Sequence, residues 1–217
     1  MGGRGASFYA GRLAEKLLGN SSFNSSPIVI STIRDKTLQG IENRIRKLKH
    51  EEAFIFDSTD KLKDGVSGGN SSVSPPKEWD NIVGATVTHG HPIGNSDYGG
   101  TLSMADVRRM TNTQWKELRA AANGQGEYNY IMRRTAKADN IGLKFRVLKD
   151  TRKLEVDVKE TYKEEYNKGI RQGKSKKQAK HLAAQKATGI VHVYWKKTLP
   201  QYGFEYVTPK KEYRYGR

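Results

Sequence analysis

Residues 88–106, THGHPIGNSDYGGTLSMAD, constrain the chain most, because they place several polar side chains of metal-site type directly after an apolar segment. Ile82–Val87 is short and rich in β-branched residues, which predicts a buried strand that continues to the His-Pro dipeptide. Residues two apart in a strand share a face, so His89 and His91 are expected to point the same way. Pro92 has no N–H for a ladder and ends the strand.

The second part of this stretch predicts a loop over Gly94–Gly100 and then a helix that opens at Ser103. Asp106 is expected in the first turn of that helix, where the macrodipole favours the ionised carboxylate that a metal requires. Catalytic zinc takes three protein ligands from His and carboxylate side chains and leaves one position for water. His89, His91 and Asp106 are therefore the candidate ligands.

The order HGHP and then S-x-x-D resembles the signature of the JAMM (MPN+) zinc metalloproteases, H-x-H-P followed by S-x-x-D. The resemblance covers about residues 34–135. It implies an α+β fold with a mixed sheet and flanking helices, a bound zinc, and hydrolysis of peptide or isopeptide bonds in a protein or peptide substrate. The interval from His91 to Asp106 is longer here than is usual in that family, which indicates an insertion in the loop.

Members of that family also carry a glutamate at the start of an earlier strand. The segment HEEAFIFD, residues 50–57, is similar to that strand, with Glu52 in the matching place and Glu51 as the alternative. By this resemblance Glu52 takes a proton from the metal-bound water. Ser103 would donate a hydrogen bond to the oxyanion of the tetrahedral intermediate.

Each part of the motif also has a purely structural interpretation. Ser103 and Asp106 have the spacing of a helix capping box. A His-x-His pair is usually structural or on the surface, and glutamates at the start of a strand are usually solvated. The occurrence of all these parts in one order favours the metal site over the structural interpretations taken singly.

Periodic patterns place the motif within a longer series of elements. Apolar residues at three- and four-residue spacing predict a helix over residues 34–49, and two strands are expected over 52–58 and 62–66. A hairpin is expected from 118–122 and 127–132 around the Asn-Gly-Gln-Gly turn. The predicted organisation is a flexible segment with a short helix over 1–26, a JAMM-like domain over 27–135, and a basic helical extension with a last strand and a tail over 136–217.

The extension predicts a helical hairpin. One apolar stripe runs from Val147 to Tyr166, and a capping box at Ser175 starts a second helix, in which the expected apolar face includes Leu182. Residues 1–110 hold 14 basic and 12 acidic side chains, whereas residues 111–217 hold 25 and 11. This asymmetry indicates a nucleic-acid or acidic-protein partner. The candidate contacts lie at the hairpin tip: Lys174, Lys176, Lys177 and Lys180.

Composition excludes some classes of protein. The chain has no cysteine, which rules out disulfides and thiolate metal sites, and no apolar run approaches the ~20 residues that span a bilayer. The start also lacks the apolar core of a secretory signal, so a cytoplasmic protein is expected. MGGRGAS is similar to the starts of phage and prophage proteins, which places the expected protein in a bacterial host or in a virion.

Three functions are compatible with these patterns. The first is a JAMM-like zinc hydrolase. The second is a phage structural or nucleic-acid-binding protein that keeps the scaffold with an inactive site and works through its basic helices, since fold does not fix function. The third is a metal-dependent nuclease, which the lack of further carboxylates near the motif disfavours because a two-metal site would need them.

Overall fold

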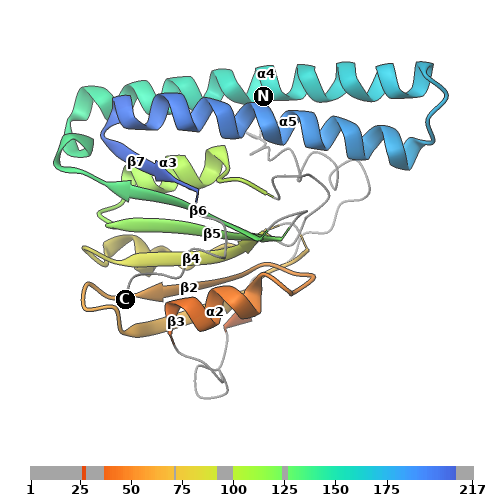
Figure 1. Ribbon diagram of the computed structural model, residues 1–217. Helices are drawn as coiled ribbons and strands as arrows, with labels where there is room; N and C mark the ends of the chain where they lie inside the picture. The colour runs from red at the N-terminus through yellow and green to blue at the C-terminus, as the bar shows by residue number, and fades with distance from the viewer. Residues whose placement is uncertain (1–25, 28–36, 71, 92–99, 124–126, 209–217) are drawn as a thin grey trace, which may run out of the picture.

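The computed structural model describes residues 26–27, 37–70, 72–91, 100–123 and 127–208. These residues form a mixed β-sheet flanked by helices, with a helical hairpin beside it, which confirms the predicted α+β class (Figure 1). The predictions for the N-terminal helix and the strand after it, for most of the loop after His91 and for the C-terminal tail lie outside the described residues.

The sheet has seven strands in the order β1-β3-β2-β4-β5-β6-β7. All neighbouring strands are antiparallel except β4 and β5, which are parallel. The bounds of the strands are β1 Ser26–Pro27, β2 Glu52–Phe56, β3 Leu62–Ser67, β4 Thr86–His91, β5 Glu117–Asn123, β6 Glu127–Arg134 and β7 Phe204–Val207. The predicted strands at 52–58, 62–66, 118–122 and 127–132 are therefore present with shifts of one or two residues at some ends.

The helices lie on both sides of this sheet. Their bounds are α2 Leu38–Ile45, α3 Met104–Asn112, α4 Ile141–Arg171 and α5 Lys176–Thr198, with short 3₁₀ helices η2 Lys77–Asn81, η3 Ala136–Asp139 and η4 Leu199–Tyr202. The parallel pair β4 and β5 is joined through α3, because parallel neighbours require a crossover connection. This crossover brings the end of β4 and the start of α3 to the same end of the sheet.

Strand β4 begins later than the sequence indicates. The prediction of a strand over Ile82–Val87 is wrong for its first four residues, because η2 ends at Asn81 and a turn follows it. Gly84 has φ +70°, a left-handed conformation that ends any extended run, and Val83 is exposed. The buried strand occupies the next six residues and reaches His91 as predicted.

Alternation along β2 divides the apolar core between the two faces of the sheet. Phe54 and Phe56 pack under α2 with Ile41 and Ile45, which are fully buried and contribute about 1.5–3 kcal/mol each. Side chains on the opposite face belong to a larger cluster that also contains α3, α4 and α5 residues. This larger cluster includes residues on both sides of the domain boundary that was predicted at 135/136.

The C-terminal half forms the predicted helical hairpin, in which α4 and α5 run side by side (Figure 1). The helices meet at Gly173, whose φ of +75° allows the reversal, and Ser175 forms the predicted capping box with Gln178. A Cβ on Gly169 would lie 2.9 Å from the Ala179 Cβ, so glycine permits the close approach of the two helices at this end.

The buried face of α5 differs in part from the predicted one. Leu182 is 39% exposed, whereas Ala184 faces the core. Apolar residues lie on both sides of the buried face of α5, so their spacing in the sequence does not show which of them face the core. The predicted last strand is present as β7, which pairs with β6 and closes one edge of the sheet.

Candidate metal centre

Strand β4 places two imidazoles on one face of the sheet. His89 and His91 are 4% and 3% exposed, and their ring centroids lie 4.6 Å apart. Within the ladders His89 pairs with Ala53 of β2 and with Ala120 of β5. These small neighbours leave space for imidazole rings beside a strand that is otherwise tightly packed. The predicted shared face of the two histidines is confirmed.

Helix α3 brings a carboxylate to the same place. Ser103 is its N-cap, and the capping box is complete: the Asp106 N–H donates to Ser103 Oγ at 2.8 Å, and the Ser103 N–H donates to Asp106 Oδ2 at 2.8 Å. The structural interpretation of this S-x-x-D segment is therefore correct. It does not exclude a metal site, because the same carboxylate also faces both histidines.

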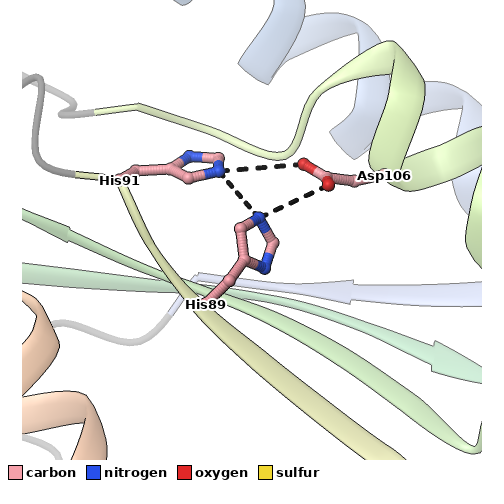
Figure 2. Close-up of side chains that lie close together, drawn as sticks. All are labelled: His89, His91 and Asp106. Atoms are coloured by element: carbon pink, nitrogen blue, oxygen red, sulfur yellow. Dashed lines mark hydrogen bonds and ion pairs between the residues drawn. The ribbon is translucent and has the colours of Figure 1, made fainter. Parts of the chain in front are cut away.

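Figure 2 shows the three side chains converging on one point. The Nε2 atoms of His89 and His91 lie 2.8 Å apart, and they lie 3.4 and 3.8 Å from the Oδ1 and Oδ2 atoms of Asp106, respectively. One ligand atom from each residue lies within 4.8 Å of the others. Two imidazole nitrogens and one carboxylate oxygen form a donor set that suits zinc.

The backbone fixes the orientation of one ring. His91 Nδ1 lies 2.7 Å from the carbonyl oxygen of Gly100. A carbonyl only accepts hydrogen bonds, so Nδ1 carries the proton, and in a neutral imidazole this leaves Nε2 with a lone pair. The lone pair points toward His89 and Asp106, as a metal ligand requires.

A cavity of about 320 Å³ lies beside this group. Glu51, His89 and Asp106 contribute its acidic and imidazole lining, while much of the remaining wall is apolar and contains Ala53, Val73, Pro75, Val87, Ala105, Trp115 and Leu118. Glu51 is only 3% exposed, and its Oε2 accepts a hydrogen bond from the Val73 N–H at 3.0 Å. A buried carboxylate therefore shares one cavity with two of the three candidate ligands.

Glu52 lies on the other face of the sheet and is not among the residues that line this cavity. Its carboxylate accepts a hydrogen bond from Arg44 Nη2 at 2.5 Å and contacts His50 Nε2 at 3.0 Å. Adjacent residues of a strand face opposite sides, so only one of the two glutamates can face the histidines. The geometry places Glu51, the alternative from the sequence, on the side of the histidines, whereas Glu52, the preferred residue, faces Arg44.

The remaining predicted residues do not line the cavity. Ser103 is 1% exposed and caps α3, and it is not among the lining residues of the cavity. Lys174, Lys176 and Lys177 are exposed and Lys180 is partly buried. These lysines lie at the turn of the α4–α5 hairpin, which extends beyond the strands in Figure 1.

Arg109 was not singled out by the sequence, although it shapes the cavity wall. Its guanidinium donates to the carbonyls of Pro75 and Pro76, pairs with Asp80 at 2.8 Å and lies over the Trp115 ring. The available signal was its position three residues after Asp106 on one helix, because residues at that spacing share a face.

Comparison of the chain with protein-family models, with curated proteins and with solved structures gives no match. Among the described residues, no helix combines the length and the apolar character that a bilayer crossing requires.

Proposed function

We propose that the protein is a zinc-dependent hydrolase of peptide or isopeptide bonds that resembles the JAMM metalloproteases. The observation that carries the proposal is the convergence of His89, His91 and Asp106 beside a cavity that also contains Glu51. These residues come from three elements or their flanks, and their arrangement has the parts of a metal-assisted hydrolytic site.

The donor set supports zinc over the hard cations. Magnesium and calcium prefer oxygen ligands, whereas two imidazoles and one carboxylate are a common zinc combination that leaves a position for water. Zinc bound there would lower the pKa of that water toward neutrality. His89, His91 and Asp106 would hold the ion, and the capping box would keep the Asp106 carboxylate in place.

Glu51 has the position of a general base. Its carboxylate lies in the cavity next to the ligands, and the hydrogen bond from the Val73 N–H holds one oxygen. In the proposed reaction Glu51 takes a proton from the attacking water and later delivers it to the leaving amine. The oxyanion role of Ser103 stays a prediction, and its hydroxyl oxygen accepts a hydrogen bond from the Asp106 N–H.

The cavity wall supports a peptide substrate. Val73, Pro75 and Trp115 line a recess beside the polar end, and such a recess suits an aliphatic side chain next to the scissile bond. Arg109 forms hydrogen bonds to Pro75 and Pro76 and thereby fixes that wall.

Zinc per chain, measured by elemental analysis on protein without a histidine tag, tests the metal site. About one zinc is expected in the wild type, and a His89→Ala/His91→Ala variant should lose it. The matched control is His50→Ala/His181→Ala, which removes two histidines outside the site and should retain zinc. Equal zinc in all three proteins, or none in the wild type, would overturn the proposal.

A second candidate function is nucleic-acid or acidic-protein binding by the hairpin, in a phage structural protein. The observation that favours it is the charge of α5, which contains six lysines and no acidic residue. Lysines at the tip would contact phosphates, and binding would weaken steeply with salt. Anisotropy with labelled duplex DNA from 50 to 200 mM salt measures this binding.

The variant for this test replaces Lys174, Lys176, Lys177 and Lys180 by glutamine. Its control replaces four exposed lysines outside the hairpin, Lys47, Lys49, Lys77 and Lys137, and changes the net charge equally. A loss of DNA binding in the hairpin variant but not in the control variant supports this function. Equal losses in both variants indicate only nonspecific attraction, and full binding by the hairpin variant contradicts the candidate.

A further inference from the structure

The four residues from Gly100 to Ser103 form a buried segment that links the metal ligands to the C-terminal half of the chain. Thr101 is 3% exposed, Leu102 is fully buried and Ser103 is 1% exposed. At one end of the segment the Gly100 carbonyl accepts a hydrogen bond from the Nδ1–H of His91. At the other end Ser103 caps the helix that carries Asp106. The segment thus contacts two of the three candidate ligands.

Gly100 packs directly against the His91 side chain. A Cβ at this position would lie 3.0 Å from the His91 Cβ and 3.0 Å from its Nδ1, which is closer than side chains normally approach. The segment and the imidazole ring are therefore in close contact. A shift of the segment by a few tenths of an ångström therefore changes the hydrogen bond that orients the imidazole.

Helix α5 holds the segment from the core side. Trp195 is fully buried, and its Nε1–H donates to the Leu102 carbonyl at 2.9 Å. This bond joins residues that are 93 positions apart in the chain. It supplies a partner for a buried carbonyl that would otherwise cost about 1–3 kcal/mol to leave unpaired.

Strand β7 holds the segment through a second, independent bond. The Tyr206 hydroxyl lies 2.7 Å from Thr101 Oγ1 and 3.1 Å from Nδ1 of His192 on α5. The Tyr206 ring also stacks on Tyr130, with ring centroids 6.4 Å apart. The hydroxyl is thus placed by packing on one side and by a hydrogen bond on another.

We infer that Tyr206 is a positioning residue for the metal centre, acting on His91 through Thr101 and Gly100 in the segment that Trp195 also anchors. This inference rests on the proposed metal site. Strand β7, which follows the hairpin, then has a role in the chemistry that is separate from any partner at the hairpin tip. It holds the segment whose Gly100 carbonyl sets which nitrogen of His91 carries the proton and thereby presents Nε2 to the ion. Direct hydrogen-bond partners of a metal ligand, here the Gly100 carbonyl on His91, are typically worth about 10–100-fold in metal affinity, and Tyr206 acts on that partner at one remove.

The test uses Tyr206→Phe and Thr101→Val, which each remove one end of the same hydrogen bond with little change in volume. The control is Tyr202→Phe, which removes a tyrosine hydroxyl that bonds Asp150 in the same half of the chain. Cobalt(II) titration, followed by its visible absorption, reports metal affinity. Nitrogen NMR of histidine-labelled, metal-free protein reports the His91 tautomer.

We expect Tyr206→Phe and Thr101→Val each to weaken cobalt binding by about 3- to 10-fold, at or below the range for direct partners of a ligand, with His91 changing from the Nδ1–H tautomer to a mixture. The double variant should be no worse than Tyr206→Phe alone, because that variant already removes the bond to Thr101. Tyr202→Phe should bind as the wild type does. A general loss of stability, in contrast, would lower affinity in the control as well.

The outcomes separate this inference from the metal site itself. Cobalt binding by the wild type, with unchanged affinity and tautomer in Tyr206→Phe and Thr101→Val, overturns the positioning role and leaves the metal site intact. No cobalt binding by the wild type overturns the proposed function. In that case the His91 tautomer in the metal-free proteins still tests the positioning role. A change of tautomer in Tyr206→Phe and Thr101→Val supports the role, and an unchanged tautomer overturns it.

Discussion

Glu51 and Glu52 are adjacent in the chain and face opposite sides of the sheet: Glu51 lines the cavity beside His89, and Glu52 pairs with Arg44 on the other face. We therefore expect Glu51→Gln to retain zinc and to lose about 10²–10⁴-fold in peptide hydrolysis, the usual contribution of a general base. Glu52→Gln is the isosteric control and should stay active. Full activity in Glu51→Gln together with loss in Glu52→Gln would reverse the assignment.

The second prediction concerns a buried ion pair beneath α2. Glu42 and Arg119 are each 1% exposed, and the guanidinium contacts both carboxylate oxygens, at 2.5 and 3.2 Å. Arg119→Met removes the guanidinium that contacts both oxygens of the buried Glu42 carboxylate, so it should cost about 3–5 kcal/mol of unfolding free energy in urea. The double variant Glu42→Leu/Arg119→Met should recover part of that loss. If the second substitution lowers the unfolding free energy further, so that the two losses add, the ion pair does not explain the cost of Arg119→Met.

The third prediction concerns pH and His192. Burial, and then the nearby Lys196 charge, lower the pKa of this imidazole below its ordinary value. The unfolded chain therefore binds the proton more readily, so the stability that His192 contributes is complete above about pH 6.5 and falls as the pH drops below it. Urea unfolding at pH 7.5 and 5.0 measures this slope.

His192→Gln should flatten that pH dependence while keeping an acceptor near the Tyr206 hydroxyl. The control is His181→Gln, because His181 lies exposed on the same helix. It should leave the slope unchanged. If both variants give the wild-type slope, other groups account for the pH dependence.

The fourth prediction compares two glycines with left-handed backbones. Gly173 has φ +75° and nothing within 4 Å of an added Cβ, whereas Gly203 has φ +85° and would place a Cβ 2.4 Å from the Ala138 N. Gly173→Ala should cost about 1–2 kcal/mol, the price of the left-handed conformation alone. Gly203→Ala should cost clearly more because the backbone of η3 must also move. Chemical denaturation of both variants gives the difference, and equal costs would show that the contact relaxes freely.

Local signals in the sequence predicted much of the site. The alternation of β4 was enough to place His89 and His91 together, and the Ser103 capping box was enough to start α3 at the right residue. Both depend only on neighbours in the chain. The resemblance to a known signature then proposed the same three ligands that the fold brings together.

Features that depend on distant pairing could not be predicted in the same way. The choice between Glu51 and Glu52 requires the register in which Ala53 pairs with His89, and that pairing joins separate strands. The bond from Trp195 to Leu102 spans nearly half the chain, and no periodicity indicates it. The turn at Gly84 was missed because the residues around it have strand-like composition.

The crossover from β4 through α3 to β5 has a consequence for how such a site can diversify. His91 is held by β4 and by the Gly100 carbonyl, and Asp106 is held by the cap of α3, so elements on either side of residues 92–99 fix both candidate ligands. Loop-closure entropy grows slowly with loop length, and a doubling costs only about 0.6 kcal/mol. We therefore expect insertions between residues 92 and 99 to leave the candidate ligands in position. The separation of the histidines and the aspartate along the chain can then vary without a change in their arrangement in space.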